Sequence, residues 1–198
     1  SKMKHYWAVK HEFQGIDSVG GNLQLSTVQL DVKDAKVYGI NYMDNDGSKK
    51  GCIICHSSIG SIERWMYSIL EEGMKREKPM LPVWLSPSQL RLIPVSEKHL
   101  EYCKSLQFKN VRVDIDDSND SLGKKIAKAG KEWIPYVAVI GDKEMESNKV
   151  MVNVRENESK IELSIEDIEK EIHEKCQGLP FRRIPVPKLL SQRPVFFG

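Results

Sequence analysis

Residues 55–64 read Cys-His-Ser-Ser-Ile-Gly-Ser-Ile-Glu-Arg and join a short apolar strand to the start of a helix. Gly60 permits close approach of another backbone segment, and Ser61 belongs to the residue types that cap helices. Arg64 falls in the first helical turn, where the positive end of a helix favours acidic side chains. Two interpretations are equally favoured. Arg64 binds an anion such as phosphate together with free N–H groups, or it is solvated and pairs with Glu63 or a nearby aspartate.

The residues before this junction predict an antiparallel sheet, because short apolar or alternating runs are separated by turn-forming residues. The expected strands are His5–Phe13, Leu23–Val32, Val37–Met43 and Cys52–Cys55. A helix is predicted from about Ser61 to Met74, since apolar residues recur there at helical spacing. Its apolar stripe consists of Ile62, Trp65, Met66, Ile69 and Leu70.

Beyond a charged linker at 75–82, strands alternate with helices, which predicts a small α/β sheet packed by helices. Strand-like runs are Trp84–Val95, Val111–Ile115, Tyr136–Ile140 and Lys149–Val154. One helix is expected after Ser96, one with Leu122, Ile126, Ala129 and Trp133 on its apolar face, and one from Ser164. We therefore expect domains at 1–78 and 79–178. A basic, proline-containing tail at 179–198 cannot form an α-helix.

Composition excludes several classes of protein. The 198 residues carry 30 Lys and Arg against 28 Asp and Glu, a net charge of +2, so bulk charge does not predict nucleic-acid binding. Segment charges are +1 for residues 1–80, −3 for 81–178 and +4 for 179–198. No apolar run is long enough to span a membrane, and four cysteines do not indicate a secreted disulfide scaffold. A cytoplasmic protein is expected.

The Cys52-Ile-Ile-Cys55-His56 run has the letters of a haem or metal motif, but on a strand the two cysteines point to opposite faces. We interpret both as packing residues, and likewise Cys103 and Cys176 on apolar helix faces. Two charged clusters follow in the second part of the chain. They are the acidic run Asp114, Asp116, Asp117 and Asp120, read as a loop with helix-capping acids, and the basic stripe Lys124, Lys128 and Lys131, read as a solvated surface.

Several stretches in chain order resemble one family. Gly60–Arg64 after a strand is similar to motif 3 of the class II aminoacyl-tRNA synthetases, and Gln24–Asp31 resembles the adenylate-site strand of the threonyl-tRNA synthetases. Pro82–Gln89 resembles the entry to a class IIa anticodon-binding domain. The match continues through Leu122–Ile126, Trp133–Tyr136 and Gly141–Ser147. The whole resembles the C-terminal part of an archaeal-type threonyl-tRNA synthetase, a fragment of a longer enzyme.

This resemblance implies roles in the catalytic part. Arg64 would be the motif 3 arginine that orients ATP, bound with Mg²⁺, and Lys10 would be the lysine beside the aminoacyl-adenylate. The positions that would line the ATP and threonine pockets are Gln24, Thr27, Gln29 and Ser61. Motifs 1 and 2 are missing, so this chain alone is expected not to activate threonine.

The resemblance also implies roles in the anticodon part. Asn119 and Glu144 correspond to positions that read anticodon bases, as do Trp133 and Asn153, which are usually Arg in bacterial members. Trp133 could stack on a base or belong to the core. Candidate backbone contacts are Arg155, Lys124 and Lys128.

The family holds a catalytic Zn²⁺ whose third ligand, normally His, falls here on Cys55 or, with a one-residue shift, on His56. The other two ligands are absent. The implied activity is ligation of threonine to its tRNA by a full-length homodimer that does not bind membranes. Two alternatives remain: a non-catalytic or editing-type paralog that binds tRNA without aminoacylating it, and an interaction module that dimerises through its sheet edge.

Overall fold

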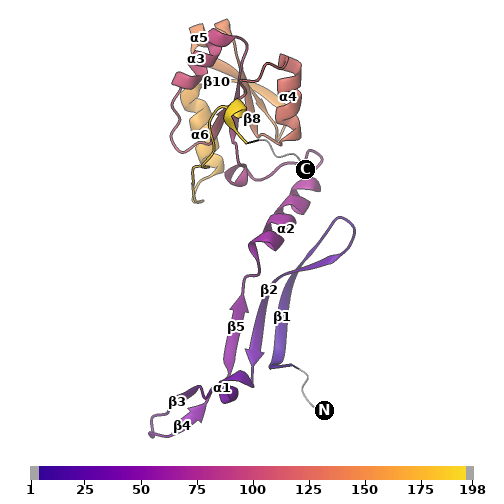
Figure 1. The fold of residues 1–198 in the computed structure, drawn as a ribbon, viewed down its shortest axis with the longest axis vertical. Coiled ribbons are helices and arrows are strands. Elements are labelled where there is room, and N and C mark those ends of the chain that lie inside the picture. The colour runs from indigo at the N-terminus through magenta and orange to yellow at the C-terminus, as the bar shows by residue number, and fades with distance from the viewer. Residues whose placement is uncertain (1–4, 195–198) are drawn as a thin grey trace. The chain divides into compact units, whose positions relative to one another are not determined.

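The computed structural model describes residues 5–194 and divides the chain into two compact units between Lys75 and Arg76. The boundary expected from the sequence lies three residues later, after residue 78. The predicted order, an antiparallel sheet followed by an α/β unit with a mixed sheet, is confirmed. Each unit is described by itself (Figure 1).

The first unit is built on a three-stranded antiparallel sheet in the order β1-β2-β5. Its strands are β1 (Trp7–Ile16), β2 (Asn22–Asp31) and β5 (Ile54–Ser58), and β3 (Asn41–Met43) pairs with β4 (Lys49–Gly51) in a separate hairpin. The helices are α1 (Asp34–Val37) and α2 (Ile62–Met74). The helix predicted from Ser61 is thus confirmed, with Ser61 as its N-cap residue.

Two strand predictions in this unit are wrong in part. Residues 37–43 do not form one strand, because α1 ends at Val37 and β3 begins only at Asn41. The carboxylate of Asp31 accepts hydrogen bonds from the backbone N–H groups of Lys33 and Asp34, which turns the chain into α1. The strand expected at Cys52–Cys55 runs instead from Ile54 to Ser58.

The first unit leaves apolar surface exposed. Val9 and Phe13 on one face of β1 are 59% and 53% exposed. On α2 the expected stripe is exposed as well, with Ile62 at 76% and Met66 at 58%. The predicted apolar stripe of α2 therefore exists, but its side chains are not buried in a core of this unit.

The second unit is a five-stranded mixed sheet in the order β10-β9-β8-β6-β7. Strand β6 is parallel to β7 and β8, and β9 is antiparallel to β8 and β10. The strands are β6 (Leu90–Pro94), β7 (Val113–Ile115), β8 (Tyr136–Ile140), β9 (Lys149–Val154) and β10 (Ser159–Ser164). The helices are α3 (Glu97–Ser105), α4 (Leu122–Lys131), α5 (Asp142–Ser147) and α6 (Ile165–Lys175), with 3₁₀ turns η1 (Val83–Leu85) and η2 (Leu190–Gln192).

The helices cover the two faces of this sheet unequally. Within the second unit, Figure 1 shows α3, α5 and α6 on one side of the sheet and α4 alone on the other. The larger core lies on the three-helix side and includes Leu92, Val152 and Ile168. The smaller core lies under α4, where Ile93 and Ala129 are buried. Because α4 packs on β6 and the same small core includes Val137 of β8, only the α4-side face of β9 and β10 lacks a helix of its own among the described residues.

Several details of the second unit differ from the sequence prediction. Strand β10 and helix α5 were not predicted, and Trp84–Val95 divides into η1 and β6. Trp133 does not lie on the α4 face, because α4 ends at Lys131 and Trp133 follows with a φ of 55°. Cys55 is exposed rather than packed, Cys176 is half-buried, and Cys103 is buried as predicted.

The acidic run is not a set of helix caps, because the N-cap residue of α4 is Ser121. Asp114 and Asp116 are instead fully buried. Asp114 accepts hydrogen bonds from Arg91 Nε and Nη2 at 2.8 and 2.9 Å, and Glu132 pairs with Arg91 Nη2 at 2.6 Å. Beneath α4 there is therefore a buried ion network, which the sequence analysis did not predict.

The described part of the tail, residues 179–194, packs against β7 and the loop after it. The N–H of Ile115 donates to the carbonyl of Lys188, and the Ser191 hydroxyl bonds to Asp117 at 2.5 Å. Arg193 Nη1 reaches Asp114 at 3.2 Å. Within residues 5–194 no helix has the length and apolar content needed to cross a membrane.

Candidate nucleotide site and nucleic-acid interface

One face of the first-unit sheet gathers most of the residues assigned to ATP and threonine. Cross-strand partners share a face of an antiparallel sheet, and the register pairs Lys10 with Gln29 and Gln29 with His56. Thr27 pairs with Ser58 and so lies on the same face, two residues from Gln29. We call this the polar face.

Hydrogen bonds order the polar face. Tyr6 Oη donates to Gln29 Oε1 at 2.6 Å, and Gln29 Nε2 lies 3.4 Å from Thr27 Oγ1. His56 Nε2 lies 3.1 Å from Asp31 Oδ2. Lys10 is held by an ion pair with Glu12. The face therefore presents an amide, an imidazole and an ammonium group in fixed relative positions.

Cys55 and His56 lie on opposite faces of β5. Cys55 pairs with Leu30, which is 39% exposed on the apolar face, whereas His56 pairs with Gln29 on the polar face. Of the two residues considered as a zinc ligand, His56 is thus the one beside Lys10 and Gln29. Residues 5–194 hold no cluster of three or more His, Cys, Asp or Glu side chains that could bind a metal, so they do not by themselves fit a complete zinc site.

The junction before α2 has the geometry that its sequence predicts. Gly60 has a φ of +83°, and a Cβ atom there would overlap the backbone carbonyl of Leu25. Ser61 Oγ accepts from the N–H of Arg64 at 3.4 Å, and Arg64 Nη1 donates to the carbonyl of Gln24 at 2.9 Å. Among the described ion pairs Arg64 has no acidic partner, so the expected alternative of a local salt bridge with Glu63 is not observed.

Asp31 is buried beside the polar face and contacts His56. Burial acts to raise its pKa, but hydrogen bonds from the N–H groups of Asp34 and Lys33 and from His56 outweigh it and lower the pKa to about 2. Burial and the neighbouring Asp31 raise the pKa of Asp34. Asp31 is therefore the ionised member of this carboxylate pair.

Acidification is expected to loosen the α1 turn in a window set by Asp31. A depressed carboxyl pKa contributes stability that is complete above the ordinary value of 3.8 and is lost as the pH falls toward about 2. Carbon-13 NMR of the Asp31 carboxyl between about pH 5 and pH 2 measures the pKa directly. A titration midpoint at 3.8 would contradict the assigned hydrogen bonds. The amide signals of α1 should change over the same pH range in the wild-type chain, and D31N should abolish that change.

In the second unit, the α4-side face of the sheet holds Asn153, with Arg155 at its margin. Asn153 on β9 pairs with Val137 of β8 and with Lys160 of β10, so it points to the α4 side. Met151, on the same face of β9, is 40% exposed. Together with the adjoining flank of α4 these strands form a surface that we call the open sheet face.

The two ends of α4 separate the assigned residues into two groups. Asn119 is exposed just before α4, and Glu144 stands in α5 after β8, so both lie at the C-terminal ends of the parallel strands. Trp133 and Arg155 lie at the other end, next to the start of β8. A ten-residue helix spans about 15 Å, so Asn119 and Trp133, which flank α4, are about that far apart along its axis.

Some assigned side chains already make structural contacts. Glu144 Oε2 accepts from the N–H of Gly141 at 3.0 Å and so helps to start α5. Arg155 donates to the carbonyls of Pro79 and Gly130 at 2.8 and 2.9 Å. It therefore links the segment before η1 to the last turn of α4. Asn153 Nδ2 lies 3.4 Å from the carbonyl of Val137. These contacts were not evident from the sequence, because each partner is distant in the chain.

The lysines of α4 differ in exposure. Lys124, Lys128 and Lys131 are exposed, as the stripe predicts, and Lys124 is 3.9 Å from Asp120. Lys125 is buried instead, and its Nζ donates to the carbonyl of Asp116 at 3.0 Å. Three cations of α4 thus face solvent.

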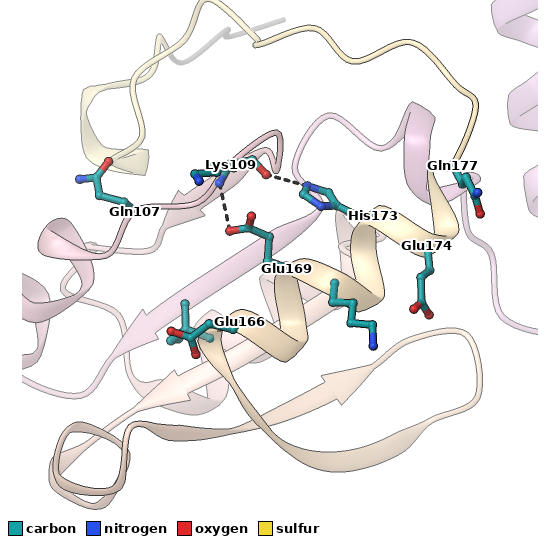
Figure 2. A pocket seen from close by; sticks show the side chains of 9 residues that line it. Gln107, Lys109, Glu166, Glu169, His173, Glu174 and Gln177 are labelled. Atoms are coloured by element: carbon teal, nitrogen blue, oxygen red, sulfur yellow. Dashed lines mark hydrogen bonds between the residues drawn. The ribbon is translucent and has the colours of Figure 1, made fainter.

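A separate pocket of about 670 Å³ runs along α6 (Figure 2). Figure 2 shows His173 and Glu169 turned toward Lys109, and the hydrogen bonds join His173 Nε2 to the Lys109 carbonyl and the Lys109 N–H to Glu169. These contacts fasten the segment after α3 onto α6. None of the residues predicted to bind substrate or tRNA lines this pocket.

Known proteins are similar to this chain in sequence. Residues 89–175 match the family model for the anticodon binding domain. The chain is 46% identical over 202 aligned positions to a threonine–tRNA ligase from Methanosphaera stadtmanae, which covers 98% of this chain and 33% of that protein. The chain therefore spans about a third of the length of such relatives. The resemblance to the threonyl-tRNA synthetases is confirmed.

Solved structures agree in fold. The RNA binding domain of threonyl-tRNA synthetase from Cryptosporidium parvum superposes with a TM-score of 0.70 at 26% identity, covering 89% of this chain and 44% of that one. Prolyl-tRNA synthetase from the same organism superposes with a TM-score of 0.68 at 22% identity, covering 86% and 40%. The second likeness shows the fold alone.

Proposed function

Because the chain is similar along its length to part of the threonine–tRNA ligases, we propose that its second unit binds tRNA for threonine and reads the anticodon. The observation that carries this proposal is the open sheet face, where Asn153 of β9 lies in one hollow with Arg155 and with Ile126 and Gly130 of α4. Single-stranded loops are read by side chains that reach unstacked bases, and such a face is open to them.

Each of the residues assigned to the tRNA has a chemical role in this proposal. Asn119 and Glu144 hydrogen-bond to base edges at the C-terminal ends of the strands. Trp133, half-buried at the other end of α4, offers a ring for stacking. Lys124 and Lys128 contact phosphates, which fixes the register of the RNA without reading its sequence.

We propose that the first unit supplies one wall of the ATP and threonine site in a longer, cytoplasmic, homodimeric enzyme that ligates threonine to its tRNA. Arg64 at the start of α2 would contact the phosphates of ATP, bound with Mg²⁺, while Lys10, Gln24, Thr27 and Gln29 would contact the adenosine and threonine. The polar face supports this assignment because it places Lys10, Thr27 and Gln29 in one cross-strand group. His56 would be the single zinc ligand that this chain contributes.

Base substitutions in the anticodon are expected to weaken binding of the 198-residue chain to tRNA for threonine. Substituting the second or third anticodon base should cost about 1–3 kcal/mol each, roughly 5- to 150-fold in Kd, at physiological salt. N119A should remove most of the penalty for one base, because the exposed Asn119 amide makes no bond within the described residues. Fluorescence anisotropy with the normal and substituted tRNAs measures both effects.

Glu144 is best tested with glutamine, because an amide oxygen can still accept from the Gly141 N–H while the charge is lost. E146Q removes a charge from the same helix and serves as the matched control, since Glu146 is exposed. Equal, salt-sensitive binding of every anticodon variant would show backbone attraction alone and would refute base reading.

A further inference from the structure

A second basic surface lies in the second unit, between the tail and the segments before β6 and β7. It is a cleft of about 310 Å³, and none of the described residues that line it is acidic. Four of them are cations: Arg112, Arg183, Lys188 and Arg193. We call it the cationic cleft. Three of its four cations belong to the tail, whose charge stood out in the sequence without a function.

Two of these cations are partly buried and have only neutral partners. Arg112 Nε and Nη2 donate to the carbonyls of Ser86 and Trp84 at 3.0 and 2.5 Å. Lys188 Nζ donates to the carbonyl of Leu106 at 3.1 Å. Burial lowers the pKa of both Arg112 and Lys188, which is the signature of charge that is removed from water without an opposing charge.

The other two cations leave the cleft with a net positive charge. Arg193 pairs with Asp114 at 3.2 Å, but that carboxylate is also bonded to Arg91 and is therefore shared. The Arg183 side chain is exposed and makes no hydrogen bond or ion pair with residues that the structure describes. A guanidinium is thus available at the mouth of a cleft that lacks a counter-charge.

The cationic cleft is separate from the open sheet face. Pro87 and Ser88 line it just before β6, and Val111 lines it just before β7, so it opens at the N-terminal ends of these parallel strands. Asn119 and Glu144 follow the C-terminal ends of β7 and β8. A ligand in the cleft therefore lies at the end of the parallel strands opposite to Asn119 and Glu144.

We propose that the cationic cleft binds phosphate groups of the RNA backbone, as a second contact outside the anticodon. The guanidinium groups match phosphate geometry, and the partly buried Lys188 gains the counter-charge that it lacks. Phe108 and Val186 in the lining offer apolar surface beside the sugar. That the RNA is tRNA for threonine rests on the proposed function. The phosphate site itself, which does not read base sequence, is independent of that function.

The test uses R183Q in the 198-residue chain, because Arg183 makes no contact that folding needs. K170Q is the control, since Lys170 is exposed on α6, lines neither the cationic cleft nor the open sheet face, and its loss changes the net charge equally. R183Q should weaken binding of tRNA for threonine about 3- to 10-fold at 0.15 M salt and lower the slope of log K against log salt by about 1. The penalty for substituted anticodon bases should stay unchanged.

Inorganic phosphate gives a second readout by NMR, with shifts expected at Arg112, Arg183 and Lys188 in the wild-type chain. Equal salt slopes for R183Q and K170Q would overturn the proposal. Phosphate shifts without any R183Q effect on tRNA would replace it with a small-anion site. An R183Q effect alongside equal binding of all anticodon variants would uphold the cleft and refute base reading instead.

Discussion

D114A is expected to lower the free energy of unfolding of the second unit by about 3–5 kcal/mol, because it leaves the Arg91 charge buried and without its bidentate partner. Arg91 is 1% exposed and Asp114 is fully buried. Burial by itself would lower the pKa of Arg91, yet Asp114 and Glu132 raise it, so the network holds the guanidinium charged. Asp114 also accepts from Ser88 at 2.6 Å, and this bond would be lost too.

Hydrogen exchange of the buried β8 amides, such as those of Ala138 and Ile140, reports unfolding of the second unit separately from the first. D120A is the matched control. Its 3.9 Å pair with Lys124 is exposed on both sides, and such pairs contribute about 0–1 kcal/mol. A loss below about 1 kcal/mol for D114A would show that the buried network is not stabilised by Asp114.

G60A is expected to disrupt the junction between β5 and α2. A residue other than glycine at this positive φ costs about 1–3 kcal/mol, and the added Cβ would meet the Leu25 carbonyl, which is backbone and cannot rotate away. Either β2 or the start of α2 must then shift, so the bond between Arg64 and the Gln24 carbonyl should break. Amide exchange along the first turns of α2 should accelerate accordingly.

G51A provides the control for this change. Gly51 ends β4, and a Cβ there would meet no atom within contact distance. Its effect should remain within about 0.5 kcal/mol, as for most surface substitutions. If G60A also left the amide exchange rates of α2 unchanged, the close approach of the Leu25 carbonyl to Gly60 would be contradicted.

The sequence predicted best those features that depend on neighbours in the chain. The Gly60 approach, the Ser61 cap and the buried positions of α6 (Ile165, Ile168 and Ile172) follow from local turn chemistry and helical spacing, and all three are confirmed. Strand β10 alternates as Ser-Lys-Ile-Glu-Leu-Ser but was not recognised, because its apolar residues are few. Helix α5 was missed because it is six residues long and depends on Glu144 accepting from Gly141.

Contacts between distant residues explain the rest. Asp114 and Asp116 look like loop acids in the sequence, and only the parallel pairing of β6 with β7 places Arg91 against Asp114. Similarly, the choice between Cys55 and His56 needed the β2–β5 register, because the side chains of adjacent strand residues point to opposite faces. The roles of individual site residues remain predictions.

The pairing of the tail with β7 has a consequence for solubility. Strand β7 is the last strand of its sheet, and an exposed outer strand offers unpaired N–H and C=O groups to another chain. Here Ile115 bridges in parallel to Leu189, and the Ile115 N–H is taken by Lys188, so the tail occupies the position of a further strand. The prolines at 185 and 187 keep this added segment from offering a regular edge of its own. The tail thus covers the edge of β7 and hinders aggregation through edge-to-edge strand pairing.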